Sequence, residues 1–180
     1  MENFDELNLK RELQIYIDEN FIADVDESFF EKVEETKCFE EKPFSKPHEI
    51  FGYAVDKIDF RKIQDEQAEE TFSEKLLRLI AESGEKNSAI YNRANIDRRH
   101  FSKICNHRNY QPSKLTALAF AVALKLNFNE TQELLAAAGY TLTKNNLADV
   151  IISFFIERNF FDVDKINQYL YDYEQPLLGG

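Results

Sequence analysis

Apolar residues recur at helical spacing along most of the chain, and this pattern predicts an all-α protein. Residues 7–36 begin with Leu9, Leu13 and Ile17 on one helical face, and Phe29–Val33 fits a second short helix. Pro43, Pro47 and Gly52 then interrupt the pattern. Residues 39–53 are therefore expected to form a linker or an extended arm.

A compact domain is expected to begin at residue 71. Thr71 and Glu74 have the spacing of a capping box, in which a hydroxyl and a glutamate satisfy the first amides of a helix. Phe72, Leu76 and Ile80 give that helix its buried stripe, and Gly84 suits the left-handed position that ends it. A helix between the Thr71 cap and Gly84 is therefore expected.

Residues 87–108 predict two short helices joined by a tight turn. Ile90 and Ala94 share one face of the first helix, and Phe101 and Ile104 share one face of the second. Between them, Asn95 adopts the left-handed conformation at low cost, and an aspartate follows that suits a helix cap. This is the pattern of a helix-turn-helix, whose second helix offers its outer face to the DNA major groove.

Three more helices are expected between residues 110 and 158. One starts at Tyr110-Gln-Pro112, with the proline at or near its first turn, and another is capped around Asn129–Gln132 and closed by Gly139. Leu147–Arg158 forms the third and is more apolar than a one-sided surface helix needs.

Residues 141–180 are expected to form a helical hairpin followed by a tail. Asn159 suits the end of the apolar helix, and Asp162 suits the cap of the next. The hairpin is expected to pack on two surfaces: the core domain, and either a second subunit or the N-terminal region. Leu177–Gly180 is interpreted as a flexible tail whose leucines dock locally or on a partner.

Charge is distributed unevenly among the 180 residues, whose net charge is −11. Residues 1–70 have a net charge of −12, residues 71–111 carry 8 basic and 4 acidic side chains, and residues 112–180 have a net charge of −3. Positive charge is therefore concentrated around the helix-turn-helix, as expected of a nucleic-acid footprint. No apolar run is long enough for a membrane span, and the acidic N-terminus lacks the features of a secretion signal. A cytoplasmic protein with reduced Cys38 and Cys105 is expected.

The outward face of the second short helix holds the main candidates for DNA contact. Arginine and lysine suit guanine edges and phosphates, and small polar groups add hydrogen bonds. Residues beside this helix are candidates for positioning on phosphates. The base-reading candidates are Arg98, Arg99, His100, Ser102 and Lys103, and the phosphate candidates are Arg93, Arg108 and Lys114.

Other chemistry finds little support in the sequence. His100, Cys105 and His107 lie within eight residues, but they point in different directions and no fourth ligand is apparent. No phosphate-binding glycine loop or nucleophile motif is present. The sequence therefore predicts a protein that is not an enzyme and that has no metal or cofactor.

The segment Thr71–Tyr140 resembles the lambda-repressor-like, Xre/Cro-type helix-turn-helix family. The matching positions are Ile90-Tyr91, the Asn95-Ile96 turn, the Asp97 cap and Phe101-Ser102-Lys103-Ile104. The resemblance implies a five-helix domain over 71–140, between an acidic helical extension and linker over 1–70 and a helical hairpin and tail over 141–180. It also adds Asn87 or Ser88 as a phosphate contact, where the family commonly has glutamine. Tyr91 departs from the family, which has a small alanine there, and Cys105-Asn106-His107 replaces its usual Glu-x-Gly.

Two functions follow as hypotheses. The first is a DNA-binding transcriptional regulator of repressor type that acts as a homodimer, because one such domain reads only a few base pairs of double-stranded DNA. The alternative is an adaptor or assembly protein that uses the same fold to bind a protein partner, through the acidic N-terminal region or the C-terminal hairpin. RNA binding through the same basic face is a third option.

Overall fold

The computed structural model describes residues 4–22 and 70–179, and within these ranges the chain is all-α, with eight helices and no strands. The expected helix at 29–33, the linker at 39–53 and Cys38 lie outside the described residues. All eight helices belong to one compact unit. None of them is long and apolar enough to cross a membrane. The helices are α1 (Phe4–Asn20), α4 (Phe72–Ser83), α5 (Asn87–Arg93), α6 (Arg98–Asn106), α7 (Lys114–Ala123), α8 (Phe128–Ala137), α9 (Leu147–Glu157) and α10 (Val163–Asp172).

Most helix ends form where local chemistry predicts them. Thr71 and Glu74 form the capping box of α4, and Gly84 ends that helix with a φ of 69°. Asn159, which follows the C-cap residue of α9, has a positive φ of 55°. The Asp162 side chain accepts from the Lys165 amide at the start of α10. These four predictions are confirmed.

The starts of α7 and α8 differ from the sequence prediction. Ser113 caps α7 by accepting from the Thr116 amide at 3.1 Å, so Pro112 lies before the helix rather than in its first turn. Asn127, not the segment 129–132, caps α8 and forms a capping box with Glu130. Both corrections have the same cause: a short polar side chain directly before an apolar helix satisfies its first amides wherever the backbone is extended.

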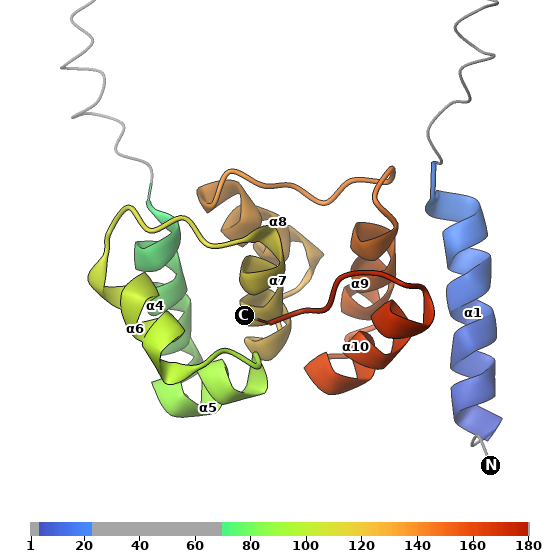
Figure 1. The fold of residues 1–180 in the computed structure, drawn as a ribbon, viewed down its shortest axis with the longest axis horizontal. Coiled ribbons are helices and arrows are strands. Elements are labelled where there is room, and N and C mark those ends of the chain that lie inside the picture. Colours follow the sequence, from blue (N-terminus) through green and yellow to red (C-terminus); the bar gives the residue numbers. More distant parts are fainter. Residues whose placement is uncertain (1–3, 23–69, 180) are drawn as a thin grey trace, which may run out of the picture. The chain divides into compact units, whose positions relative to one another are not determined.

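Helix α7 forms the centre of the core. All residues from Thr116 to Ala123 are buried, because the helix contacts α5, α8 and α10 on different sides. In Figure 1 it lies between the α4–α6 group and the α9–α10 pair. Its small alanines let these neighbours approach closely.

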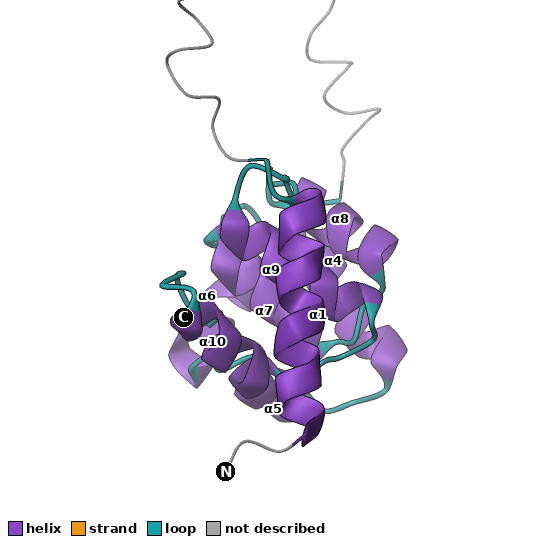
Figure 2. Cartoon of the chain, turned by 90° about the vertical axis from the view of Figure 1, so that its right-hand side faces the viewer, coloured by secondary structure: helices purple, strands orange, loops and turns teal. Residues whose placement is uncertain are grey.

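Helix α1 covers one side of α9. Leu13 and Ile17 are buried there, and the Tyr16 and Phe154 rings meet edge to face with centroids 5.4 Å apart. The Ile22 amide donates to the Lys144 carbonyl at 2.8 Å, which fixes the end of α1. Figure 2 looks onto α1 from its outer side. The second packing surface of the C-terminal hairpin was expected to contact either a second subunit or the N-terminal region. In the structure, α1 of the N-terminal region packs there.

Candidate nucleic-acid interface

The turn between α5 and α6 has the predicted backbone. Asn95 has a φ of 55°, and the Ile96 amide donates to the Tyr91 carbonyl at 2.9 Å. Ile90 in α5 and Ile96 in the turn are buried. The apolar residues therefore hold the two helices together at a fixed angle while the polar face of α6 remains outside.

Tyr91 fills the space between the two helices. It is half-buried, and its ring lies 5.2 Å from that of Phe101, whose other neighbour is Phe120 at 6.0 Å. The large side chain at this position is therefore part of the α5–α6 contact.

Asp97 caps α6 through its side chain. One carboxylate oxygen accepts from the Arg99 amide at 2.7 Å and from the His100 amide at 3.0 Å. The hydrogen bond from the His100 amide makes the largest contribution to lowering the pKa of the Asp97 carboxyl group, and that from the Arg99 amide comes next. The positive charges of the His100 and Arg99 side chains lower it further. The cap keeps the first turn of α6 in place, and this turn carries the first two arginines.

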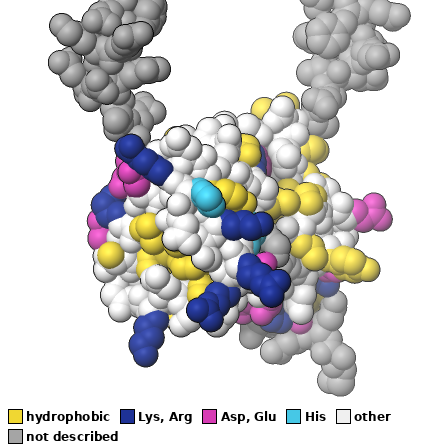
Figure 3. All heavy atoms as spheres, turned by 60° about the vertical axis from the view of Figure 1, so that its left-hand side comes forward, with side chains coloured by type: hydrophobic (Ala, Val, Ile, Leu, Met, Phe, Trp, Pro, Cys, Tyr) yellow, Lys and Arg dark blue, Asp and Glu magenta, His cyan; other side chains and the backbone are white. Residues whose placement is uncertain are grey.

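The outward face of α6 is exposed. Phe101 and Ile104 bury its inner side, which leaves Arg98, Arg99, Ser102 and Lys103 in solvent. Among the described residues, no carboxylate lies within ion-pair distance of Arg98, Arg99 or Lys103. We call these three side chains the basic face. Figure 3 shows this side of the molecule, where Lys and Arg side chains lie beside hydrophobic and a few acidic ones.

The three predicted phosphate-positioning residues are held by the protein itself. Arg93 donates to the Ala123 carbonyl and pairs with Glu85, both at 2.7 Å. Arg108 pairs with Glu74 at 2.8 Å, and Lys114 pairs with the buried Asp149. The structure thus separates the basic face from these neutralised cations.

The remaining candidates are polar residues of α5 and α6. Asn87 and Ser88 are exposed in the first turn of α5, whose N-cap residue, Lys86, provides no side-chain capping hydrogen bond. A ring nitrogen of His100 lies 3.1 Å from the Tyr110 hydroxyl, so this half-buried histidine is tied to the α6–α7 connection. Ser102 accepts from the Asn106 side-chain amide at 3.0 Å.

The thiol and histidines near α6 do not converge on a metal site. No group of three His, Cys, Asp or Glu side chains suitable for a metal ion occurs among the described residues. Burial raises the pKa of the Cys105 thiol, which keeps it in the neutral form.

The C-terminal segment contacts the turn between α5 and α6, which sequence reasoning did not predict. Asn95 donates from its side chain to Asp164 of α10 at 2.7 Å. Leu178 is buried, and its backbone forms two hydrogen bonds with the Asn167 side chain. Gly179 follows with a φ of 127°, and a Cβ there would lie 3.1 Å from the Asn95 carbonyl oxygen. The expected local docking of the tail is therefore confirmed for Leu178, whereas Leu177 remains 47% exposed.

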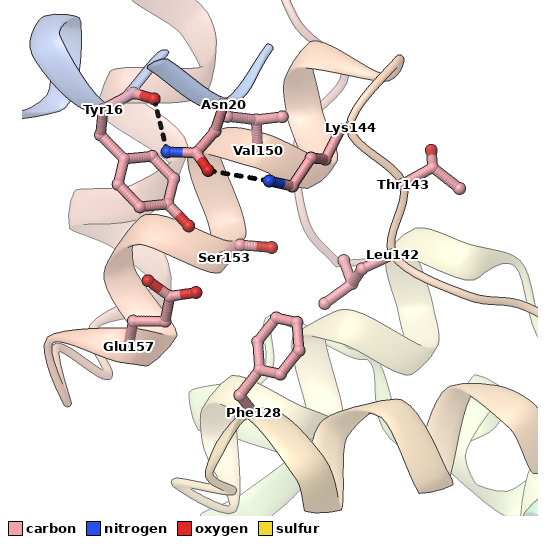
Figure 4. A pocket seen from close by; sticks show the side chains of 9 residues that line it. All are labelled: Tyr16, Asn20, Phe128, Leu142, Thr143, Lys144, Val150, Ser153 and Glu157. Carbon is pink, nitrogen blue, oxygen red and sulfur yellow. Dashed lines mark hydrogen bonds between the residues drawn. The ribbon is translucent and has the colours of Figure 1, made fainter. Parts of the chain in front are cut away.

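A small cavity of about 180 Å³ lies away from this region, between α1, α8 and α9 (Figure 4). Tyr16 and Glu157 line one end, and Lys144, held by Asn20 at 3.1 Å, lines another. Burial, and then the Glu157 carboxylate, raise the pKa of Tyr16 to about 12, so this hydroxyl stays protonated.

Comparison with known proteins adds no family. The chain matches no family model, no curated protein and no solved structure. The class that the fold and the site define is therefore an all-α protein whose described part carries an exposed basic helix face without ion pairs.

Proposed function

We propose that the protein is a DNA-binding transcriptional regulator that reads double-stranded DNA with α6. In this proposal residues 71–140 form a lambda-repressor-like domain, and the five helices α4–α8 within them support it. The observation that carries the proposal is the basic face: three cations on one exposed helix side, unpaired among the described residues, beside a capped and packed turn. Such a face is suited to enter a major groove.

The cations of the site are either ion-paired or without an ion pair among the described residues, and this difference assigns them different roles in DNA binding. Arg98 and Arg99 project from the first turn of α6, where recognition helices contact base edges. Arg93, Arg108 and Lys114 are already neutralised, so phosphate contact by them requires exchange of an existing partner. We therefore assign the larger share of binding to Arg98, Arg99 and Lys103.

The test begins with selection of duplexes from a random DNA library by the full-length protein. Affinity for the selected duplex is then measured by fluorescence anisotropy across a range of salt concentrations. Replacing Arg98, Arg99 and Lys103 together by alanine should weaken binding by about 100-fold or more, since each good base contact is worth about 1–3 kcal/mol. For every phosphate that these side chains neutralise, the substitution should also reduce the slope of log K against log salt by about 0.9.

A matched control separates the basic face from net charge. Lys144→Gln removes one positive charge on the α8–α9 connection and keeps a side chain able to bond Asn20. It should leave DNA affinity almost unchanged, whereas Arg99→Ala should not. Equal affinities for the triple variant and the natural protein would refute the proposal.

The adaptor hypothesis is favoured by one observation, the neutralisation of three of the predicted site cations by the protein's own carboxylates. It predicts no retention on DNA at low salt together with a stable co-purifying protein. Competition by unlabelled RNA and unlabelled DNA against the same labelled duplex distinguishes RNA binding.

A further inference from the structure

Helix α1 exposes apolar side chains on the side opposite its buried face. Leu7 is 59% exposed, Ile15 is 49% exposed, and Ile22, just after the helix, is 58% exposed. Half of the exposed large hydrophobic residues in the described part of the chain are therefore on this one segment. Leu13 and Ile17, on the other side, are buried against the core.

The exposed residues form a narrow stripe with two charges between them. At roughly 100° per residue, Leu7, Arg11, Ile15 and Asp18 fall within an arc of about 80° on the helix surface. Arg11 is exposed and has no ion pair among the described residues. Asp18 is also exposed, and it accepts from Gln14, one turn earlier, at 2.8 Å. We call Leu7, Arg11, Ile15, Asp18 and Ile22 the outer stripe.

The outer stripe is complementary to the outer stripe of a second α1 helix that runs in the opposite direction. Arg11 and Asp18 lie at equal distances on either side of a point just before Ile15, and so do Leu7 and Ile22. In an antiparallel pair of α1 helices, the two Ile15 side chains meet near the axis, and Arg11 of each copy faces Asp18 of the other. In a parallel pair, Arg11 faces Arg11 and Asp18 faces Asp18. The charges therefore favour the antiparallel arrangement, which a two-fold axis generates.

We propose that the outer stripe of α1 is the contact surface for a second copy of this chain, paired antiparallel. Apolar contact between Leu7, Ile15 and Ile22 supplies the affinity. The two Arg11–Asp18 pairs fix the direction and register of the helices, which is what charged pairs at an interface do best. In this respect the inference rests on the proposed function, because DNA reading by two α6 helices would require a homodimer. Self-association is measured without DNA, so failure of this proposal can be distinguished from failure of the DNA-binding proposal.

The first experiment measures the self-association of the full chain by sedimentation equilibrium over a wide range of concentrations. The natural protein should show a monomer–dimer equilibrium. Ile15→Asp places a charge at the centre of the contact and should raise the dimer dissociation constant about tenfold or more. Leu77→Asp is the matched control, because Leu77 is an exposed leucine of α4, 36% exposed, and should leave the constant unchanged. Circular dichroism verifies that both variants fold.

A charge exchange then tests the direction of pairing. Arg11→Asp and Asp18→Arg each create two like-charge contacts per antiparallel dimer, so each alone should weaken self-association about tenfold. An equimolar mixture of the two variants should recover dimers, because one copy then carries two aspartates and the other two arginines, so both contacts of the mixed pair join opposite charges. The double variant R11D/D18R restores both opposite-charge pairs and is therefore the decisive arm, which should recover the natural dissociation constant.

Three results would overturn the proposal. The first is a chain that stays monomeric at all concentrations, which is also the result if residues 23–69 of the same chain occupy the stripe. The second is a dimer that Ile15→Asp leaves intact. The third is a double variant R11D/D18R that associates no better than Arg11→Asp or Asp18→Arg alone.

Discussion

Helices α6 and α9 have similar lengths and both begin at a capping side chain, yet they relate to the rest of the protein in opposite ways. In α9 every residue from Ala148 to Ile156 is buried, because α1, α8 and α10 all pack on it. In α6 only Phe101 and Ile104 are buried. One helix is held by the core on several sides, and the other is held along a single edge.

Their charged groups differ in the same way. Asp149 in α9 is 2% exposed and receives hydrogen bonds from the Thr143 backbone, the Thr143 hydroxyl and Lys114. Arg98, Arg99 and Lys103 in α6 have no ion-pair partner among the described residues. Substitutions in α9 should therefore affect folding, and substitutions on the outer face of α6 should affect binding alone.

The strongest test of this contrast is truncation of a buried ring. Phe155 is fully buried, and its ring lies 5.1 Å from those of Phe154 and Tyr169. Phe155→Ala should lower the free energy of unfolding by about 3–5 kcal/mol, because it removes buried apolar surface and leaves a cavity. Arg99→Ala should change it by less than about 0.5 kcal/mol. Urea unfolding monitored by circular dichroism measures both, and similar losses for the two variants would contradict the contrast.

A smaller effect is expected from the buried ion pair of α9. Asp149→Asn keeps the size of the side chain but removes the charge that Lys114 and Thr143 bond, so it should cost about 1.5–3 kcal/mol. Glu133→Gln is the matched control, since its pair with Lys75 is at the surface and is worth about 0.2–1 kcal/mol. If Glu133→Gln cost as much as Asp149→Asn in the same urea measurement, burial would not decide the value of these pairs.

The features that could be predicted from the sequence are those that depend on neighbouring residues. The Thr71 capping box, the left-handed Gly84 and Asn95, and the Asp97 cap all follow from side chains within four residues of the helix end. The same rules misplaced the starts of α7 and α8, because several polar residues precede each helix and only the extended backbone selects Ser113 and Asn127.

The features that sequence reasoning missed depend on contacts between distant residues. Lys114 and Asp149 are 35 residues apart, and Arg108 and Glu74 are 34 apart. No local pattern joins them, so charge counting treated Arg108 and Lys114 as free cations. The bond from Asn95 to Asp164 likewise exists only because α10 packs beside the turn. Exposure of Arg98 and Arg99, in contrast, followed from their helical spacing relative to Phe101 and Ile104.

The smallest expected effect concerns the cap of α6, where local bonds replace the packing that holds α9. Amide hydrogen bonds from His100 and Arg99 lower the pKa of Asp97, so its stabilising contribution is present above the ordinary aspartate pKa and is lost as the pH falls through the lowered value. Asp97→Asn keeps an oxygen acceptor but has no titrating charge, and Asp97→Ala keeps neither. At neutral pH the thermal midpoint should therefore fall in the order natural protein, Asn variant, Ala variant. On acidification below about pH 4 the natural protein should approach the Asn variant, while the gap between the two variants stays constant. Thermal unfolding at a series of pH values measures this, and a gap between the natural protein and the Asn variant that does not close in acid would show that the carboxylate charge does not stabilise α6.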